Sequence, residues 1–178
     1  SKTKGMSDAK TALDNFNNLK IGGRNYLRNS NFTDGLNYWS NNPSNAVLEN
    51  GVVKIITTTS NAFMQENIPQ LSSGDVVTLS FDAKTDDSGI LHTEMWGDKA
   101  HAVDIPLTKD FVRYSTTFTV SAKNTLYFWN KNSSFNYIRK LKLEIGNKAT
   151  DWSSSPDDVQ IQIDSVNNQL STKVSQTS

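Results

Sequence analysis

The sequence predicts an all-β protein: an antiparallel jelly-roll β-sandwich flanked by short N- and C-terminal helical linkers. Three observations support this class. Short apolar runs with period-2 alternation recur from about residue 46 onward, turn residues separate them at nearly regular intervals, and no β-α-β alternation is present. Helical spacing of apolar residues occurs only near the two ends, in residues 7–20 and 156–173.

The composition indicates one domain with short appendages and excludes several functions. The 178 residues are too few for two ordinary domains, and 18 basic residues balance 18 acidic ones. A balanced chain has no overall field to attract nucleic acid or an anionic membrane, so we expect an uncharged partner. The absence of cysteine excludes a disulfide framework, a thiolate nucleophile and a cysteine-based zinc site. No apolar run approaches the roughly 18 residues that span a membrane.

The pattern divides the chain into an N-terminal helical linker (1–20), a jelly-roll domain (21–155) and a C-terminal helix (156–178). In the linker, a candidate cap precedes apolar residues at helical spacing: Ser7, then Ala9, Leu13, Phe16 and Leu19. Gly22 and Gly23 end this pattern. The C-terminal helical pattern continues to the last residue, and we expect that both ends were cut from a longer polypeptide.

The jelly-roll domain is predicted from strands and turns. Residues 24–35 are polar and irregular, and Asn50-Gly51 is a strong hairpin signal. Strands are expected at 47–48, 52–58, 62–68, 75–84, 90–96, 102–105, 112–120, 125–130 and 138–145. Two of them show alternate residues on one face that we assign to the core: Val77, Leu79, Phe81 and Ala83, and Tyr114, Thr116, Phe118 and Val120.

The junction between the last strand and the C-terminal helix lies in residues 138–159. Leu141, Leu143 and Ile145 alternate with polar residues at 140, 142 and 144, as in a half-buried strand. The helix then begins at Pro156 after a cap at Ser155, and its apolar residues share one face: Val159, Ile163, Val166 and Leu170. Only about two heptads are present, so we expect the helix to associate with copies of itself, as a homotrimer, or with neighbouring segments.

Two segments resemble a known family. Residues 21–39 (IGGRNYLRNSNFTDGLNYW) and 142–158 (KLEIGNKATDWSSSPDD) are similar to the carbohydrate-binding-module-like domains of tail and baseplate proteins from phages of Gram-positive bacteria, lactococcal and streptococcal phages above all. The resemblance implies a jelly roll on the virion tail that binds saccharides of the host cell wall beside other tail proteins. The segments themselves are best interpreted as structural: Asn31-Phe32, Trp39 and residues 149–152 are expected to pack where the two ends of the sandwich meet.

Saccharide binding requires flat aromatic faces and fixed polar groups, and two strands offer both. In residues 91–96, alternation places His92, Glu94 and Trp96 on one face, and in residues 126–130 it places Tyr127 and Trp129 on one face. The alternative is that either tryptophan is an ordinary core residue. The loops 97–101 and 130–137 add further candidate ligands in His101, Asn130 and Tyr137, unless they are merely solvated loops.

Metal binding and catalysis have weaker support, and no cofactor is expected. Related sandwiches often hold calcium near an Asn-x-x-Phe pattern, but Thr33 stands where a glutamate would be wanted, which leaves three weak oxygen candidates: Asp34, Glu49 and Asp151. A surface metal pair of His92 and His101 is a minor alternative. Asp86 and Asp87 sit in a turn and should point apart, and no phosphate loop or nucleophile elbow is present.

We therefore predict a non-enzymatic saccharide-binding domain of a phage tail or baseplate that acts at the host cell surface. The first alternative is a structural spacer that docks onto other tail proteins and binds no sugar. The second is a glycan hydrolase, in which Glu94 would supply acid–base chemistry.

Overall fold

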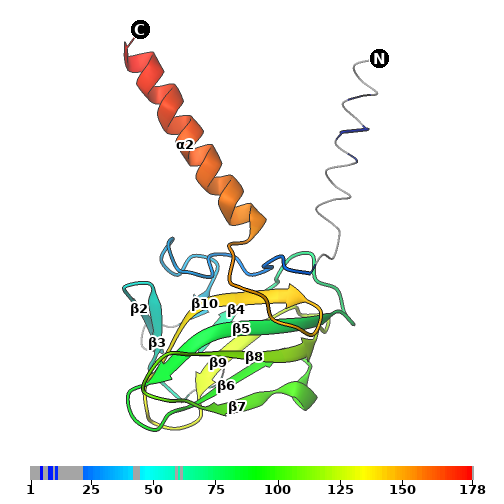
Figure 1. The fold of residues 1–178 in the computed structure, drawn as a ribbon, viewed down its shortest axis with the longest axis vertical. Coiled ribbons are helices and arrows are strands. Elements are labelled where there is room, and N and C mark those ends of the chain that lie inside the picture. Colours follow the sequence, from blue (N-terminus) through cyan, green and yellow to red (C-terminus); the bar gives the residue numbers. More distant parts are fainter. Residues whose placement is uncertain are drawn as a thin grey trace.

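The structure, a computed structural model, is a sandwich of two antiparallel sheets from which one long helix projects (Figure 1). It describes residues 5, 8, 9, 11, 22–41, 45–58, 60 and 62–177. The all-β prediction is confirmed. The predicted N-terminal helix, residues 7–20, lies outside the described residues except at isolated positions. No helix in the described part of the chain is long and apolar enough to cross a membrane.

Each sheet has five strands. The first sheet has the order β1 (Ser40–Asn41), β4 (Phe63–Gln65), β9 (Leu126–Asn130), β6 (Ile90–Met95) and β7 (Val103–Pro106). The second has the order β2 (Ala46–Glu49), β3 (Val52–Ile55), β10 (Asn136–Ile145), β5 (Val76–Thr85) and β8 (Val112–Thr119). A short 3-10 helix, η1 (Lys99–His101), follows β6. The predicted strands lie within a few residues of β2 to β10, whereas the two-residue β1 was missed.

The core lies between the two sheets and follows the predicted alternation. Val77, Leu79, Phe81 and Ala83 of β5 are all 0% exposed. Phe81 meets Phe128 of the first sheet edge to face, with ring centroids 5.6 Å apart. Full burial of side chains of this size stabilises the fold by about 1.5–3 kcal/mol each, so these alternating residues hold the two sheets together.

A β-bulge in β10 changes which residues face the core. The pairing with β5 shifts between Arg139 and Lys142, and Lys140 has a positive φ of 48°. Ile138 points inward before the bulge and Leu141 after it, although three residues separate them. The extra residue therefore lets both halves of the strand place apolar side chains in the core.

The outward side of β10 is covered, contrary to the half-buried strand predicted from its alternation. Lys142 and Glu144 are 2% and 1% exposed because the loop after β10 folds over them. Lys142 Nζ donates to Thr150 Oγ1 at 2.9 Å and to the Asp151 carbonyl at 2.7 Å, and Thr150 Oγ1 donates to Glu144 Oε1 at 2.7 Å. The alternation was read correctly, but only the tertiary fold supplies the loop that buries the polar side.

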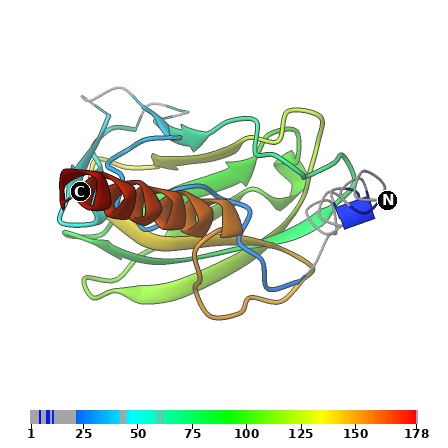
Figure 2. The same cartoon turned by 90° about the horizontal axis from the view of Figure 1, so that it is seen from above.

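Helix α2 (Pro156–Thr177) begins at the predicted cap, where the Asp158 amide donates to Ser155 Oγ at 3.1 Å. Figures 1 and 2 show it leaving one end of the sandwich and covering neither sheet. Its apolar stripe is open to solvent, with exposed fractions of 42–55% at Val159, Ile163, Val166 and Leu170. The predicted trimer therefore stays a prediction, with an uncovered surface available for it.

Candidate functional site

Strands β6 and β9 lie side by side and place the predicted aromatic and polar residues on one outer surface. Their register pairs His92 with Trp129 and Glu94 with Tyr127, while Leu91, Thr93 and Phe128 point into the core. Trp96 follows directly after β6, and its amide donates to the Thr125 carbonyl. We call the group His92, Glu94, Trp96, Tyr127 and Trp129 the aromatic face.

Three rings of the aromatic face form a line along the strands. The Trp96 and Tyr127 centroids are 5.5 Å apart, and those of Tyr127 and Trp129 are 6.1 Å apart. This spacing arises because alternate residues of a strand share one side, roughly 6–7 Å apart. Tyr127, the middle ring, is 4% exposed, so Trp96 and Trp129 are the rings of this line that a ligand could reach.

Parts of these rings are already occupied by protein groups. The His92 ring stacks on Trp129 with centroids 4.0 Å apart and planes 25° apart. Lys123 Nζ lies 4.3 Å from the centroid of Trp96, a side chain that is 39% exposed. A ligand would therefore use the free side of each ring, or displace Lys123 from Trp96.

His92 lies between two carboxylates, one of which the sequence did not indicate. Its Nδ1 is 2.5 Å from Asp104 Oδ1 on β7, and its Nε2 is 3.3 Å from Glu94 Oε1. Lys131 Nζ extends the group at 3.7 Å from Asp104 Oδ2. These contacts fix the imidazole against Trp129. Asp104 could be found only from the β6–β7 register, which sets it opposite His92.

Tyr127 contributes an unusual hydroxyl to the aromatic face. The residue is 4% exposed, and its buried hydroxyl has no hydrogen-bond partner in the described part of the structure. Burial, followed by the charges of Glu94 and Glu66, raises the pKa of Tyr127 to about 12. The phenol thus stays protonated over the physiological range, and its buried hydroxyl is not open to a ligand.

The two loops expected to flank one site lie at opposite ends of the aromatic face. The Lys131 amide donates to the Ile90 carbonyl at the start of β6, whereas Trp96 and the loop 97–101 follow its end. Because the five residues of β9 separate these ends, the loops are roughly 17 Å apart. His101 also has a partner of its own, since its Nδ1 lies 2.8 Å from the Asp98 carboxylate.

Asn130 and Tyr137 do not belong to the aromatic face, contrary to the prediction. Asn130 is 1% exposed, points inward and donates to the Ile55 carbonyl at 2.8 Å. Its position follows from alternation, because it shares the inward side of β9 with Leu126 and Phe128. Tyr137 lies on β10 in the second sheet, where its hydroxyl donates to Asp86 Oδ2 at 3.0 Å. Neither position could contact a ligand on the first sheet.

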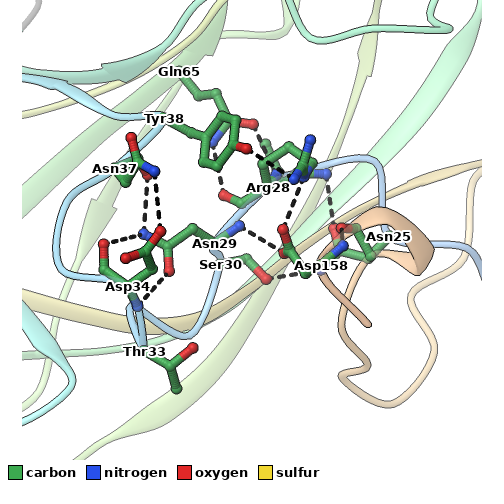
Figure 3. A network of polar contacts seen from close by, with 12 residues as sticks. Asn25, Arg28, Asn29, Ser30, Thr33, Asp34, Asn37, Tyr38, Gln65 and Asp158 are labelled. Carbon is green, nitrogen blue, oxygen red and sulfur yellow. Dashed lines mark hydrogen bonds and ion pairs between the residues drawn. The ribbon is translucent and has the colours of Figure 1, made fainter. Parts of the chain in front are cut away.

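The segment expected near a calcium site is organised by an asparagine side chain (Figure 3). Asn29 Nδ2 lies 3.3, 3.0 and 2.9 Å from the carbonyl oxygens of residues 34, 35 and 37, and Asn29 Oδ1 accepts from the Asp34 amide. The amide nitrogen thus satisfies oxygens that could otherwise face a cation. Among the described residues, no three His, Asp or Glu side chains gather as a metal site, so Asp34, Glu49 and Asp151 stay untested candidates.

The same network joins the two segments that carried the family resemblance, as predicted. Trp39 stacks on Phe63 with centroids 4.6 Å apart and donates from its indole to the Asn29 carbonyl. From the other end of the domain, the Trp152 indole donates to the Leu141 carbonyl at 3.1 Å and to Ser30 Oγ at 3.3 Å. These signature residues therefore close the base of the sandwich, away from the aromatic face.

Comparison with known proteins shows the fold. No protein-family model matches the sequence, and a search of curated proteins gives no match. The CBM22-1 and GH10 modules of Clostridium thermocellum xylanase 10B, complexed with xylohexaose, share 14% identity and a TM-score of 0.50 over 68% of this chain and 29% of that chain. The CBM22-1–CBM22-2 tandem domain of Paenibacillus barcinonensis Xyn10C shares 11% identity and a TM-score of 0.50 over 75% and 48%.

A phage structure shows a weaker likeness. The tripod from the baseplate of bacteriophage Tuc2009 shares 18% identity and a TM-score of 0.47, over 79% of this chain and 61% of that chain. Together with the strand order, the comparisons show that this chain has the jelly-roll fold of carbohydrate-binding modules.

Proposed function

We propose that the aromatic face binds an uncharged saccharide chain of a Gram-positive cell wall, and that the protein does so as part of a phage tail or baseplate. The observation that carries this proposal is the pair of accessible rings, Trp96 and Trp129, on one outer surface, with the buried ring of Tyr127 between them. Indole rings take the apolar C–H side of a pyranose, and two rings spaced along one surface can take separate units of a saccharide chain.

Polar groups beside the rings can provide selectivity. The carboxylates of Glu94 and Asp104 can accept hydrogen bonds from sugar hydroxyls. A shallow surface of this kind binds each copy weakly, because few contacts offset the lost freedom of ligand and protein. Several copies on one virion would raise the overall affinity through high effective concentration.

Two further observations support the proposal. A structure that includes this fold, the CBM22-1 and GH10 modules of Clostridium thermocellum xylanase 10B, is complexed with a saccharide, xylohexaose. The phage setting rests on the resemblance of residues 21–39 and 142–158 to tail and baseplate domains. The exposed apolar stripe of α2 is suited to forming a homotrimer, which would display three aromatic faces.

We also propose that the domain is not catalytic. Glu94 and Asp104 are the carboxylates that flank His92, and both are engaged with its ring nitrogens. A glycosidase needs one carboxyl group free to protonate the leaving oxygen and a second to act on the other side of the ring. Incubation with purified wall polysaccharide should release no sugar, and release that disappears in Glu94→Gln would contradict this assignment.

The binding proposal is tested with a fluorescent fusion of the domain and intact host cells, with purified wall polysaccharide as the defined probe. Trp96→Ala and Trp129→Ala should each lose at least tenfold in affinity while the thermal unfolding midpoint stays within a few degrees for Trp96→Ala. Tyr38→Ala removes a similarly exposed ring, 44% against 39% for Trp96, from the base of the sandwich and is the matched control. Full binding by both tryptophan variants would overturn the site and favour a structural spacer.

A further inference from the structure

A second group of rings lies on the outer surface of the other sheet, and here cations alternate with the rings. The strand register places Lys54 of β3, Tyr137 of β10 and Lys84 of β5 directly beside one another. Lys84 Nζ is 5.0 Å from the Tyr137 centroid and 5.3 Å from that of Phe111, which precedes β8. Lys54 Nζ is 4.6 Å from the centroid of Phe135. We call these five residues the cation–aromatic row.

A second line of charges runs parallel to this row. Arg139 pairs across the strands with Asp82, which pairs with Arg113. The Asp82 carboxylate accepts from Arg139 Nε at 3.1 Å and from Arg113 Nη1 at 3.3 Å. Arg139 also stacks its guanidinium 3.8 Å from the Phe111 centroid. The one carboxylate of this line is thus shared by two arginines.

The lysines of the row have no such carboxylate. Among the described residues, neither Lys54 nor Lys84 takes part in an ion pair, and both ammonium groups lie over rings instead. Asp86 accepts a hydrogen bond from the Tyr137 hydroxyl, and Glu49 also raises the pKa of that phenol, so these acidic groups act on the central ring of the row. A cation–π contact leaves most of an ammonium group's hydrogen-bonding capacity unused, because its three donors need oxygen acceptors.

We propose that the cation–aromatic row binds an anionic saccharide, whose acidic substituents pair with Lys54 and Lys84 while a sugar ring rests on Tyr137. Adjacent strands are about 4.8 Å apart, so the two lysines stand roughly 10 Å apart with one ring between them. The row thus presents an ammonium group, an aromatic ring and a second ammonium group in sequence. A chain of acidic sugars presents acidic groups and sugar rings in the same alternating order. An uncharged saccharide could accept hydrogen bonds from the two lysines but would form no ion pair with them.

This surface is separate from the aromatic face, because the two groups lie on different sheets. The inference therefore goes beyond the proposed function, and either can fail while the other holds. A balanced overall charge of 18 basic against 18 acidic residues favours a short acidic saccharide over a long nucleic acid, which draws on a wide positive field.

The test measures binding of the whole chain by isothermal titration or on a microarray. The two probes are oligogalacturonate, whose acidic groups are carboxylates, and a phosphorylated mannan, whose acidic groups are phosphates. Binding to at least one is expected. The double variant Lys54→Gln, Lys84→Gln should lose at least tenfold in affinity for that probe, and raising NaCl from 50 to 300 mM should weaken the parent protein similarly. Methyl-esterified oligogalacturonate, which lacks the charge, should not bind at this row.

Two control variants separate this proposal from the first. Lys123→Gln removes the lysine that lies over the Trp96 ring, in the turn before β9, and should leave binding of the acidic probe unchanged. Trp96→Ala should do the same. The proposal is overturned if the double lysine variant binds the acidic probes as the parent does, if neither probe binds the parent, or if oligothymidylate binds more tightly than both.

Discussion

Asp158 accepts a hydrogen bond from Arg28 Nε at 2.8 Å, although 130 residues separate them in the chain. The other oxygen of the same carboxylate accepts from the Asn29 amide at 2.7 Å (Figure 3). Asp158 occupies the first turn of α2, so this one side chain joins the helix to the start of the domain. Helix direction is thereby coupled to the segment that closes the base of the sandwich.

Asp158→Ala should therefore destabilise the protein by about 2 kcal/mol, because hydrogen bonds to charged groups are worth about 1.5–3 kcal/mol. Urea unfolding followed by tryptophan fluorescence measures this loss. Asp157→Ala is the matched control: Asp157 is exposed, and its removal should cost only the helix-dipole contribution of about 0.3–1 kcal/mol. Equal losses in the two variants would show that the contact with Arg28 does not anchor the helix.

Asn29→Ala should cost about 2–4 kcal/mol, because it removes hydrogen bonds to four part-buried backbone groups at once. Asn37→Ala, which removes an exposed amide with one side-chain contact, should cost less than 1 kcal/mol. Since the Asn29 amide already satisfies the converging carbonyls, we also expect EDTA to leave the thermal midpoint unchanged. A fall of several degrees with EDTA, reversed by calcium, would instead support the oxygen candidates Asp34, Glu49 and Asp151.

Thr150→Val tests the buried polar contacts beneath the loop after β10. The substitution keeps the shape but removes the hydroxyl that links Lys142 and Glu144, both almost fully buried. We expect a loss of about 2–3 kcal/mol in unfolding free energy, since each of these buried charged groups then loses one of its hydrogen bonds. Thr33→Val, at an exposed position, should change stability by less than 0.5 kcal/mol in the same assay.

Alkaline pH should destabilise the protein through Tyr127 and Tyr137. Burial, then neighbouring carboxylates, raises the pKa of each to about 12 in the folded state. Their stabilising contribution is complete below the unfolded value of 10 and is lost as the pH rises from 10 to about 12. Unfolding free energies measured from pH 8 to 11.5 should thus fall less steeply in Tyr127→Phe and Tyr137→Phe. Curves parallel to the parent's would contradict this origin.

The exposed stripe of α2 should mediate self-association. Sedimentation equilibrium is expected to give three times the 19.8 kDa monomer mass at high protein concentration. Ile163→Asn with Val166→Asn should abolish association, because polar residues replace the contacts of adjacent turns. Asn167→Ala, beside the stripe, provides the comparison. A parent protein that stays monomeric at every concentration would rule out a trimer formed by this helix alone.

Local patterns in the sequence determined much of this protein's secondary structure and the direction of its strand side chains. Alternation assigned the inward row of β5 and the shared side of His92 and Glu94, because side-chain direction in a strand depends only on residue parity. The same rule already placed Asn130 inward, although loop chemistry had made it a ligand candidate. The cap at Ser155 predicted where α2 begins, and this prediction also depends only on neighbouring residues.

Only the tertiary structure decided which segments meet. The β6–β7 register places Asp104 opposite His92, and the strand order places Tyr137 in the second sheet. The β6–β9 register places the two candidate loops at opposite ends of the aromatic face. The loop after β10 buried Lys142 and Glu144, which alternation alone assigns to solvent. Parity and capping act over a few residues, whereas pairing joins residues far apart in the chain and depends on how all the strands pack together.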